Sequence, residues 1–187
     1  MSIVTIIEAE RNRYASYFDA AFENVRAGNA QSVRELLISI NNEALPYPYR
    51  YLRVDAVEKR ADGTDQAYEF WLDPAEDADA RGFQLGPVAI EIYPFTWCAT
   101  QVAFDRAPDT DKLEAFLTAW LDTNDEKASG GVSPANAVHS VSPVESNGEL
   151  SYLTIDFGTA PSDALLDLID LIGNEGADRI IIVSQPR

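Results

Sequence analysis

The chain has 187 residues, 46% of them hydrophobic, including 8 Phe, 8 Tyr and 3 Trp, which excludes a disordered chain and is enough for one hydrophobic core. Its 31 acidic and 14 basic side chains give a formal net charge of −17. A field of that sign repels phosphate backbones, so we expect no nucleic-acid binding. No stretch approaches the ~20 apolar residues of a membrane span, and the apolar run at residues 3–7 is too short for a signal sequence. The composition predicts a cytoplasmic protein with no membrane partner, and a single domain, 1–187.

Two helices are predicted in the N-terminal part, residues 1–45. In residues 8–27, apolar side chains recur at three- and four-residue steps, as they do on one face of a helix. Gly28 then provides a stop signal. A second helix is predicted at about 31–43, because apolar residues again form a single stripe and two prolines follow it.

Residues 46–187 are predicted to form a mostly antiparallel sheet of six or seven strands with two further helices. The expected strands are residues 49–58, 66–72, 83–93 and 97–105, one on each side of the turn Asn147-Gly148, and 179–184. The expected helices are 109–122, with Trp120 buried, and 162–174. Residues 123–136 are rich in Gly, Ser, Pro and Asn, which is typical of a linker. The predicted fold class is therefore α+β with four helices, in the order ααββββαββαβ.

An internal similarity links residues 88–121 with residues 141–174. A shift of 53 residues aligns Phe104 with Phe157, and in both segments an Ala-Pro pair follows the strand and leads into an amphipathic helix. A duplicated hairpin-helix unit would produce this pattern and would place both phenylalanines in the core. The alternative is that strand-to-helix corners favour proline and a capping Asp or Ser whatever their origin.

The motifs of common enzymes and cofactor sites are absent from the sequence. One histidine and one cysteine cannot build a Cys/His zinc site, and no glycine-rich nucleotide loop or nucleophile elbow occurs. His139 precedes Ser140 on a predicted strand, which is typical of a surface residue. Cys98 lies in another predicted strand, and we expect it to be a small buried hydrophobic residue. We therefore expect no catalytic residues, no cofactor and no metal, and purification without stoichiometric zinc.

A candidate binding surface begins at residues 46–53, which read Pro-Tyr-Pro-Tyr-Arg-Tyr-Leu-Arg. On a strand this alternation places the tyrosines and Arg53 on one face, and both residue types are enriched in binding hot spots. The alternative is that the N-terminal helices cover the rings as core. An acidic loop at residues 73–79 would attract a basic partner. The predicted partner-binding residues are Tyr47, Tyr49, Tyr51, Arg53, Asp73, Glu76, Asp77 and Asp79.

The closing segment, residues 175–184, is similar to the helix-to-strand passage of barstar-type nuclease inhibitors. That resemblance implies an inhibitor of a basic enzyme. The leading hypothesis is a non-enzymatic acidic module that neutralises or chaperones a basic partner protein, for example an immunity or antitoxin-like inhibitor. Two alternatives are a carboxylate-dependent hydrolase with its pocket near residues 73–79, and a homo-oligomeric structural protein joined through a sheet edge.

Overall fold

The computed structural model describes residues 1–29, 31–60, 62–75, 79–127 and 133–184. It is an α+β fold in which the described helices are α1 (Ile3–Gly28), α2 (Thr110–Leu121), α3 (Asp163–Asn174) and the short 3-10 turn η1 (Trp97–Ala99). None of the described helices has the length and apolar character needed to cross a membrane.

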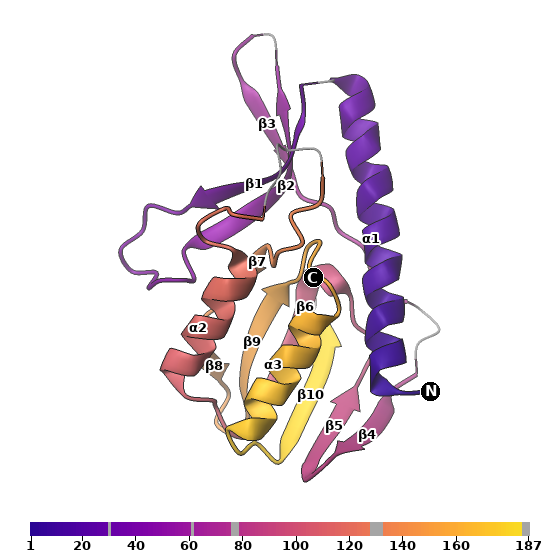
Figure 1. The fold of residues 1–187 in the computed structure, drawn as a ribbon, viewed down its shortest axis with the longest axis vertical. Helices are drawn as coiled ribbons and strands as arrows, with labels where there is room; N and C mark the ends of the chain where they lie inside the picture. Colours follow the sequence, from indigo (N-terminus) through magenta and orange to yellow (C-terminus); the bar gives the residue numbers. More distant parts are fainter. Residues whose placement is uncertain (30, 61, 76–78, 128–132, 185–187) are drawn as a thin grey trace.

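The described strands form two sheets, one of three strands and one of seven (Figure 1). The smaller sheet has the order β1-β2-β3, with bounds β1 (Val33–Ser39), β2 (Tyr51–Lys59) and β3 (Asp65–Tyr68). The larger has the order β4-β5-β10-β6-β9-β7, with β8 also paired to β9. Its strands are β4 (Arg81–Leu85), β5 (Val88–Ile92), β6 (Thr100–Phe104), β7 (Ser140–Val141), β8 (Glu145–Ser146), β9 (Ser151–Asp156) and β10 (Arg179–Ser184). The pairings of the smaller sheet are antiparallel, and those of the larger sheet are mostly antiparallel, with a parallel pairing between β5 and β10.

Helices α2 and α3 lie side by side on one face of the larger sheet (Figure 1). Alternate residues of the central strands point toward them and are fully buried, including Phe104 and Ile155. Residues of the opposite face, such as Thr154, are only half-buried. Helix α1 buries Tyr14, Phe18 and other apolar residues on one stripe. It contacts β2 of the smaller sheet and η1, the turn that leads into β6 of the larger sheet.

The predicted helix at residues 31–43 is wrong, because the chain there forms strand β1. Val33, Leu36 and Ile38 pair antiparallel with residues of β2. A stripe at three- and four-residue spacing does not distinguish a short helix from a strand when the segment is rich in β-branched residues, and strand pairing decides the outcome.

The first helix, α1, begins earlier than expected, because the Ser2 side chain accepts a hydrogen bond from the Thr5 backbone N–H and caps the helix.

The duplicated hairpin-helix unit is not confirmed. β10 lies between β5 and β6, so the first segment contains no hairpin. What the two segments share is local: β6 and β9 pair with each other, and each leads through an Ala-Pro corner to a helix. Phe104 and Phe157 are both 0% exposed, as expected. Of the predicted linker, residues 128–132 lie outside the described residues.

Trp120 was expected to be buried, and this is wrong because it lies at the margin of the face that α2 turns to the core. Leu113, Leu117 and Leu121 are the buried residues of this helix. Trp120 is half-buried at the margin, with Phe116 and the Lys127 ammonium against its ring.

Leu117→Ala is therefore expected to lower the free energy of unfolding by about 2–5 kcal/mol, through lost burial and a cavity. Trp120→Ala should lower it less, because solvent already reaches part of the indole. Urea denaturation of both variants measures the difference. A larger loss for Trp120→Ala than for Leu117→Ala would contradict the observed orientation of α2.

Candidate functional site

A cluster of charged side chains lies buried where the two sheets meet, with His139 at its centre. His139 is 0% exposed, although the sequence pattern placed it on the surface. Its Nδ1 lies 2.7 Å from Asp55 Oδ1 and its Nε2 lies 2.8 Å from Glu35 Oε1. Burial alone lowers the pKa of His139, but the hydrogen bonds to Asp55 and Glu35 raise it to about 10. The ring is therefore an imidazolium that donates both of its N–H groups.

The backbone holds this cluster together from three elements. Glu35 on β1 and Asp55 on β2 lie across from each other, because the pairs on either side of them are in register. The backbone N–H of His139 donates to Asp156 O, and its carbonyl accepts from Arg53 N, so this residue joins the larger sheet to the smaller. Glu35 has a φ of 53°, an unfavourable left-handed conformation for a residue with a side chain, which the surrounding contacts maintain.

Glu35 is the most heavily bonded carboxylate of the cluster. Besides His139, it accepts from the Thr159 hydroxyl, from the Ala135 backbone N–H at 2.8 Å and from Arg34 at 3.2 Å. Burial raises the pKa of Glu35, but the hydrogen bond and charge of His139, followed by the hydrogen bonds of Thr159 and Ala135, bring it below the ordinary value. Glu35 is thus an ionised, fully satisfied carboxylate.

Gly158 is the residue that makes room for the imidazole. It has a φ of +51°, and a Cβ placed on it would overlap the His139 ring. Its backbone N–H donates to Asp156 Oδ1 at 2.8 Å. A residue with a side chain at this position would therefore disturb both the ring and the neighbouring carboxylate.

Asp156, at the end of β9, brings a third carboxylate to the cluster. Burial raises the pKa of Asp156 to about 7, with the His139 charge opposing this rise and Asp55 adding to it. Asp55 and Asp156 both line a cleft of about 570 Å³. Because Thr154 also lines it, the cleft opens on the sheet face opposite α2 and α3. Other lining residues are Leu52, Glu69, Trp71, Cys98 and Ser142.

Cys98 is buried beside this cleft, as the sequence predicted. Burial raises the pKa of its thiol to about 11. The thiolate is the nucleophilic form of cysteine, so this residue is a poor nucleophile at neutral pH.

The predicted partner-binding tyrosines lie around the start of β2. Residues 47–50 form a turn, and the strand begins only at Tyr51. Tyr47 is 40% exposed and packs edge-on against Tyr51, with ring centroids 5.7 Å apart. Tyr49 is half-buried against the core. The four residues predicted to share one strand face therefore occupy different environments.

Arg53, the fourth residue of that set, is buried in an ion-pair network. Its guanidinium lies 3.1 Å from Asp122 and 2.7 Å from Asp125, and it also donates to the carbonyl of Glu35. These contacts connect β2 to the chain that follows α2.

The acidic loop is described only in part, since Glu76 and Asp77 lie outside the described residues. Asp73 is exposed and accepts a hydrogen bond from Trp71 Nε1 at 2.8 Å. Asp79 forms an ion pair with Arg81 at 3.7 Å.

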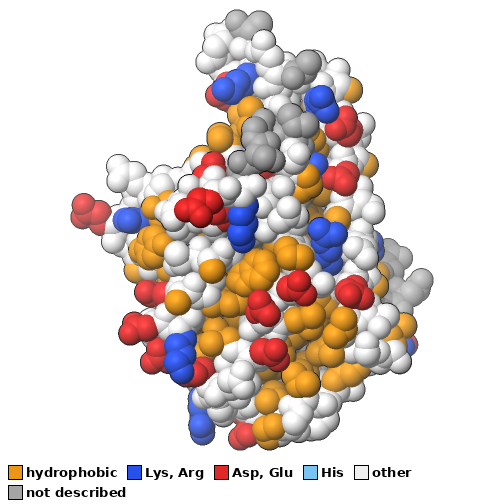
Figure 2. Space-filling model, in the orientation of Figure 1, with side chains coloured by type: hydrophobic (Ala, Val, Ile, Leu, Met, Phe, Trp, Pro, Cys, Tyr) orange, Lys and Arg blue, Asp and Glu red, His pale blue; other side chains and the backbone are white. Residues whose placement is uncertain are grey.

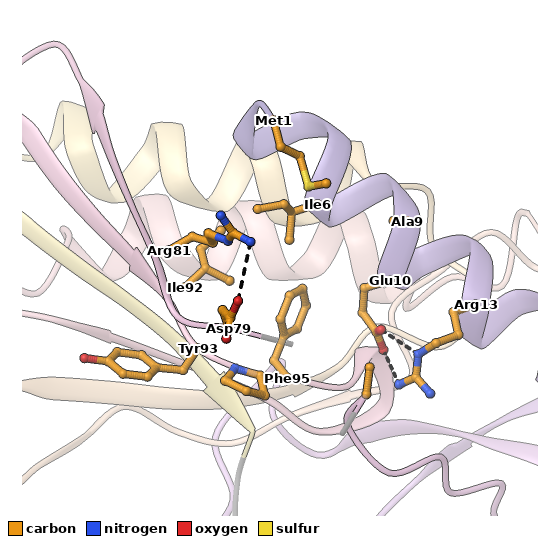
Figure 3. Close-up of a pocket in the computed structure, with 12 residues that line it drawn as sticks. Met1, Ile6, Ala9, Glu10, Arg13, Asp79, Arg81, Ile92, Tyr93 and Phe95 are labelled. Carbon is orange, nitrogen blue, oxygen red and sulfur yellow. Dashed lines mark hydrogen bonds and ion pairs between the residues drawn. The ribbon is translucent and has the colours of Figure 1, made fainter. Parts of the chain in front are cut away.

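Asp79 and Arg81 lie at a second, largely apolar pocket of about 320 Å³ beside the start of α1 (Figure 3). Glu10 and Arg13 form another ion pair there at 2.7 Å. Both carboxylates among the described lining residues are thus paired with arginine. Among the residues that the structure describes, this pocket has no convergent free carboxylates of the kind that the hydrolase alternative requires near residues 73–79.

The sequence reasoning missed Glu35, Asp55 and Asp156, and it placed His139 on the surface. A signal was present for two of the carboxylates. Asp55 follows Val54 and precedes Ala56, and Asp156 lies between Ile155 and Phe157. A carboxylate flanked by apolar residues within a strand indicates a buried charge that needs a partner.

Comparison of the chain with protein-family models, with curated proteins and with solved structures found no match in any of the three.

Proposed function

We propose that this protein is a non-enzymatic binding module that neutralises or chaperones a basic partner protein, in the manner of an immunity or antitoxin-like inhibitor. The observation that carries the proposal is an exposed apolar stripe that runs along β1 to Ile40, the residue after it. Leu36, Ile38 and Ile40 are 41%, 39% and 37% exposed, and their two-residue spacing puts them on one side of the chain. Neighbouring apolar side chains left in solvent are typical of an interaction surface.

The position of β1 at the edge of its sheet supports the same proposal. Among the described strands, only β2 pairs with it. Natural proteins protect edge strands with charged residues or proline, yet residues 36–40 contain neither. The loop that follows projects from the body of the molecule (Figure 1). This edge is therefore accessible to another chain.

The tyrosines provide a second contact area beside this stripe. Ser39 at the end of β1 pairs with Tyr51, which places Tyr51 on the face of the sheet opposite Leu36 and Ile38. The Tyr47 hydroxyl lies 3.1 Å from Thr123 Oγ1, and the exposed residues Asp125 and Glu126 follow closely in the chain. Aromatic anchors bordered by acids are suited to a basic protein surface.

The net charge supports a basic partner in particular. Residues 1–53 hold six acids and six arginines, so the whole net charge of −17 lies in residues 54–187. Acidic side chains are spread widely over the face that carries α2 and α3 (Figure 2). Such a field speeds the approach of an oppositely charged protein and loses strength as salt is added.

The test compares Tyr47→Ala with Tyr93→Ala, because each tyrosine is 40% exposed and Tyr93 lies elsewhere, at the second pocket. A partner is captured at low salt from the source lysate, and surface-plasmon kinetics are then recorded at two salt concentrations. Tyr47→Ala is expected to speed dissociation about tenfold or more, the equivalent of ~1.4 kcal/mol. Tyr93→Ala should leave dissociation unchanged, and the association rate of the wild type should fall with salt.

Two results would contradict the proposal. An association rate that is independent of salt would remove the electrostatic argument. A stable dimer at micromolar concentration without a partner, which Ile38→Asp converts to monomer, would assign the β1 stripe to self-association. Sedimentation velocity of wild type and Ile38→Asp distinguishes that case.

A further inference from the structure

We propose that Asp55, His139 and Asp156 bind a divalent transition-metal ion at the floor of the 570 Å³ cleft. One carboxylate oxygen of Asp55, one ring nitrogen of His139 and one carboxylate oxygen of Asp156 all lie within 4.8 Å of one another. Nδ1 is the ring nitrogen that faces Asp55, at 2.7 Å. Ligands bound to one such ion at about 2.0–2.2 Å are separated by somewhat less than this. Around one ion, the hydrogen-bonded pair Asp55 Oδ1 and His139 Nδ1 would separate from 2.7 Å, and the more distant ligand atoms would move closer together.

The far side of His139 is arranged as it is in metal sites. A metal-binding imidazole usually donates its other N–H to a carboxylate, which fixes the ring and strengthens it as a ligand. Glu35 is the carboxylate that accepts this N–H, 2.8 Å from Nε2. Hydrogen bonds from the Thr159 hydroxyl and the Ala135 backbone N–H fix Glu35 in turn. The ring therefore presents Nδ1 toward Asp55 and Asp156 in one orientation.

Access to the site comes through the cleft, because both Asp55 and Asp156 line it. One oxygen of Asp156 accepts from the Gly158 backbone, which aims the carboxylate while leaving its second oxygen as a donor to the ion. Three protein ligands leave positions for water or a ligand on the open side. The cleft provides room for those groups.

The donor set identifies the class of metal. One imidazole nitrogen with two carboxylate oxygens suits Zn²⁺, Mn²⁺ or Fe²⁺. Mg²⁺ and Ca²⁺ prefer a site made of oxygen ligands alone. Soft ions prefer thiolate ligands, and the Cys98 thiol is not one of these ligands, because it is directed to Thr96 and the Leu72 carbonyl.

When the ion binds, the proton on Nδ1 of His139 leaves to solvent, and Asp55 Oδ1 changes from hydrogen-bond acceptor to metal ligand.

This inference reverses the expectation of no metal, which rested on the small number of His and Cys residues. The buried carboxylate of Asp55 and the half-buried carboxylate of Asp156 replace the missing ligands. It does not depend on partner binding at β1, whose apolar stripe contributes none of the three ligands. A metal site and a docking surface are therefore tested separately.

The test is isothermal titration of the full-length protein with Zn²⁺, together with the absorption spectrum of Co²⁺ as a probe of geometry. The wild type is expected to bind one equivalent of Zn²⁺, and Co²⁺ should show the bands of a low-coordinate site with a nitrogen ligand. Asp156→Asn is expected to weaken Zn²⁺ binding tenfold or more. It is preferred to a His139 variant because it keeps the side-chain shape and avoids leaving two buried carboxylates without their partner.

The matched control is Glu69→Gln, which removes a carboxylate from the same cleft but not from the three ligands. It should leave Zn²⁺ affinity within about twofold of wild type, and circular dichroism should show both variants folded. The proposal is overturned if the wild type binds no Zn²⁺ or Mn²⁺ at millimolar concentration. It is equally overturned if Asp156→Asn and Glu69→Gln weaken binding to the same extent, since the ion would then be held by general negative charge.

Discussion

Gly158→Ala is expected to lower the free energy of unfolding by about 3–5 kcal/mol, because the new methyl group displaces His139. The Cβ would overlap the imidazole ring, and the positive φ adds backbone strain. If the ring moves, Glu35 and Asp55 lose the cation that lies between them, and both are buried. Breaking a buried ion pair leaves an uncompensated charge, which is why the expected loss is so large.

The control for this prediction is Gly86→Ala. Gly86 has a φ of +57°, close to the +51° of Gly158, but no atom lies within 4 Å of its ideal Cβ. Backbone strain alone should lower stability by about 1–2 kcal/mol. Urea denaturation of both variants separates strain from displacement of the ring. Equal losses would show that the contact between Gly158 and His139 contributes nothing.

Elements with an unambiguous local pattern, such as a continuous apolar run or an amphipathic stripe with a cap, were predictable. The strand expected at residues 179–184 matches β10, and the helices expected at 109–122 and 162–174 match α2 and α3 within a residue or two. Asp109 caps α2 by accepting from the Lys112 backbone, as its position before the apolar stripe indicated. β1 was not predictable in this way, because the spacing of its apolar residues fits a helix as well as a strand, and pairing with β2 decides between them.

The buried cluster could not be assembled from the sequence, because its contacts join distant residues. The contact between His139 and Asp55 spans 84 residues, and that between His139 and Glu35 spans 104. Local patterns report which residues are buried but not which buried charges meet. The positive φ of Glu35 also has no local signal, since the sequence there contains no glycine or asparagine.

Arg53→Met is the second change with a large expected effect, a loss of about 3–5 kcal/mol in the free energy of unfolding. The sequence assigned Arg53 to partner binding, but its side chain is 0% exposed and pairs with Asp122, which is 6% exposed. Methionine fills much of the same volume without the charge. The change therefore leaves Asp122 and the carbonyl of Glu35 without their guanidinium donor.

Arg179→Met is the matched control, since the Arg179 guanidinium lies 2.7 Å from Glu91 but is 48% exposed. An exposed pair contributes about 0–1 kcal/mol, and salt screens it. Urea denaturation at low and high salt should show a large loss for Arg53→Met at both concentrations. The small loss for Arg179→Met should disappear at high salt. If Arg53→Met left the stability of the isolated protein unchanged, Arg53 would have no structural role, and the residue would return to the partner-binding surface.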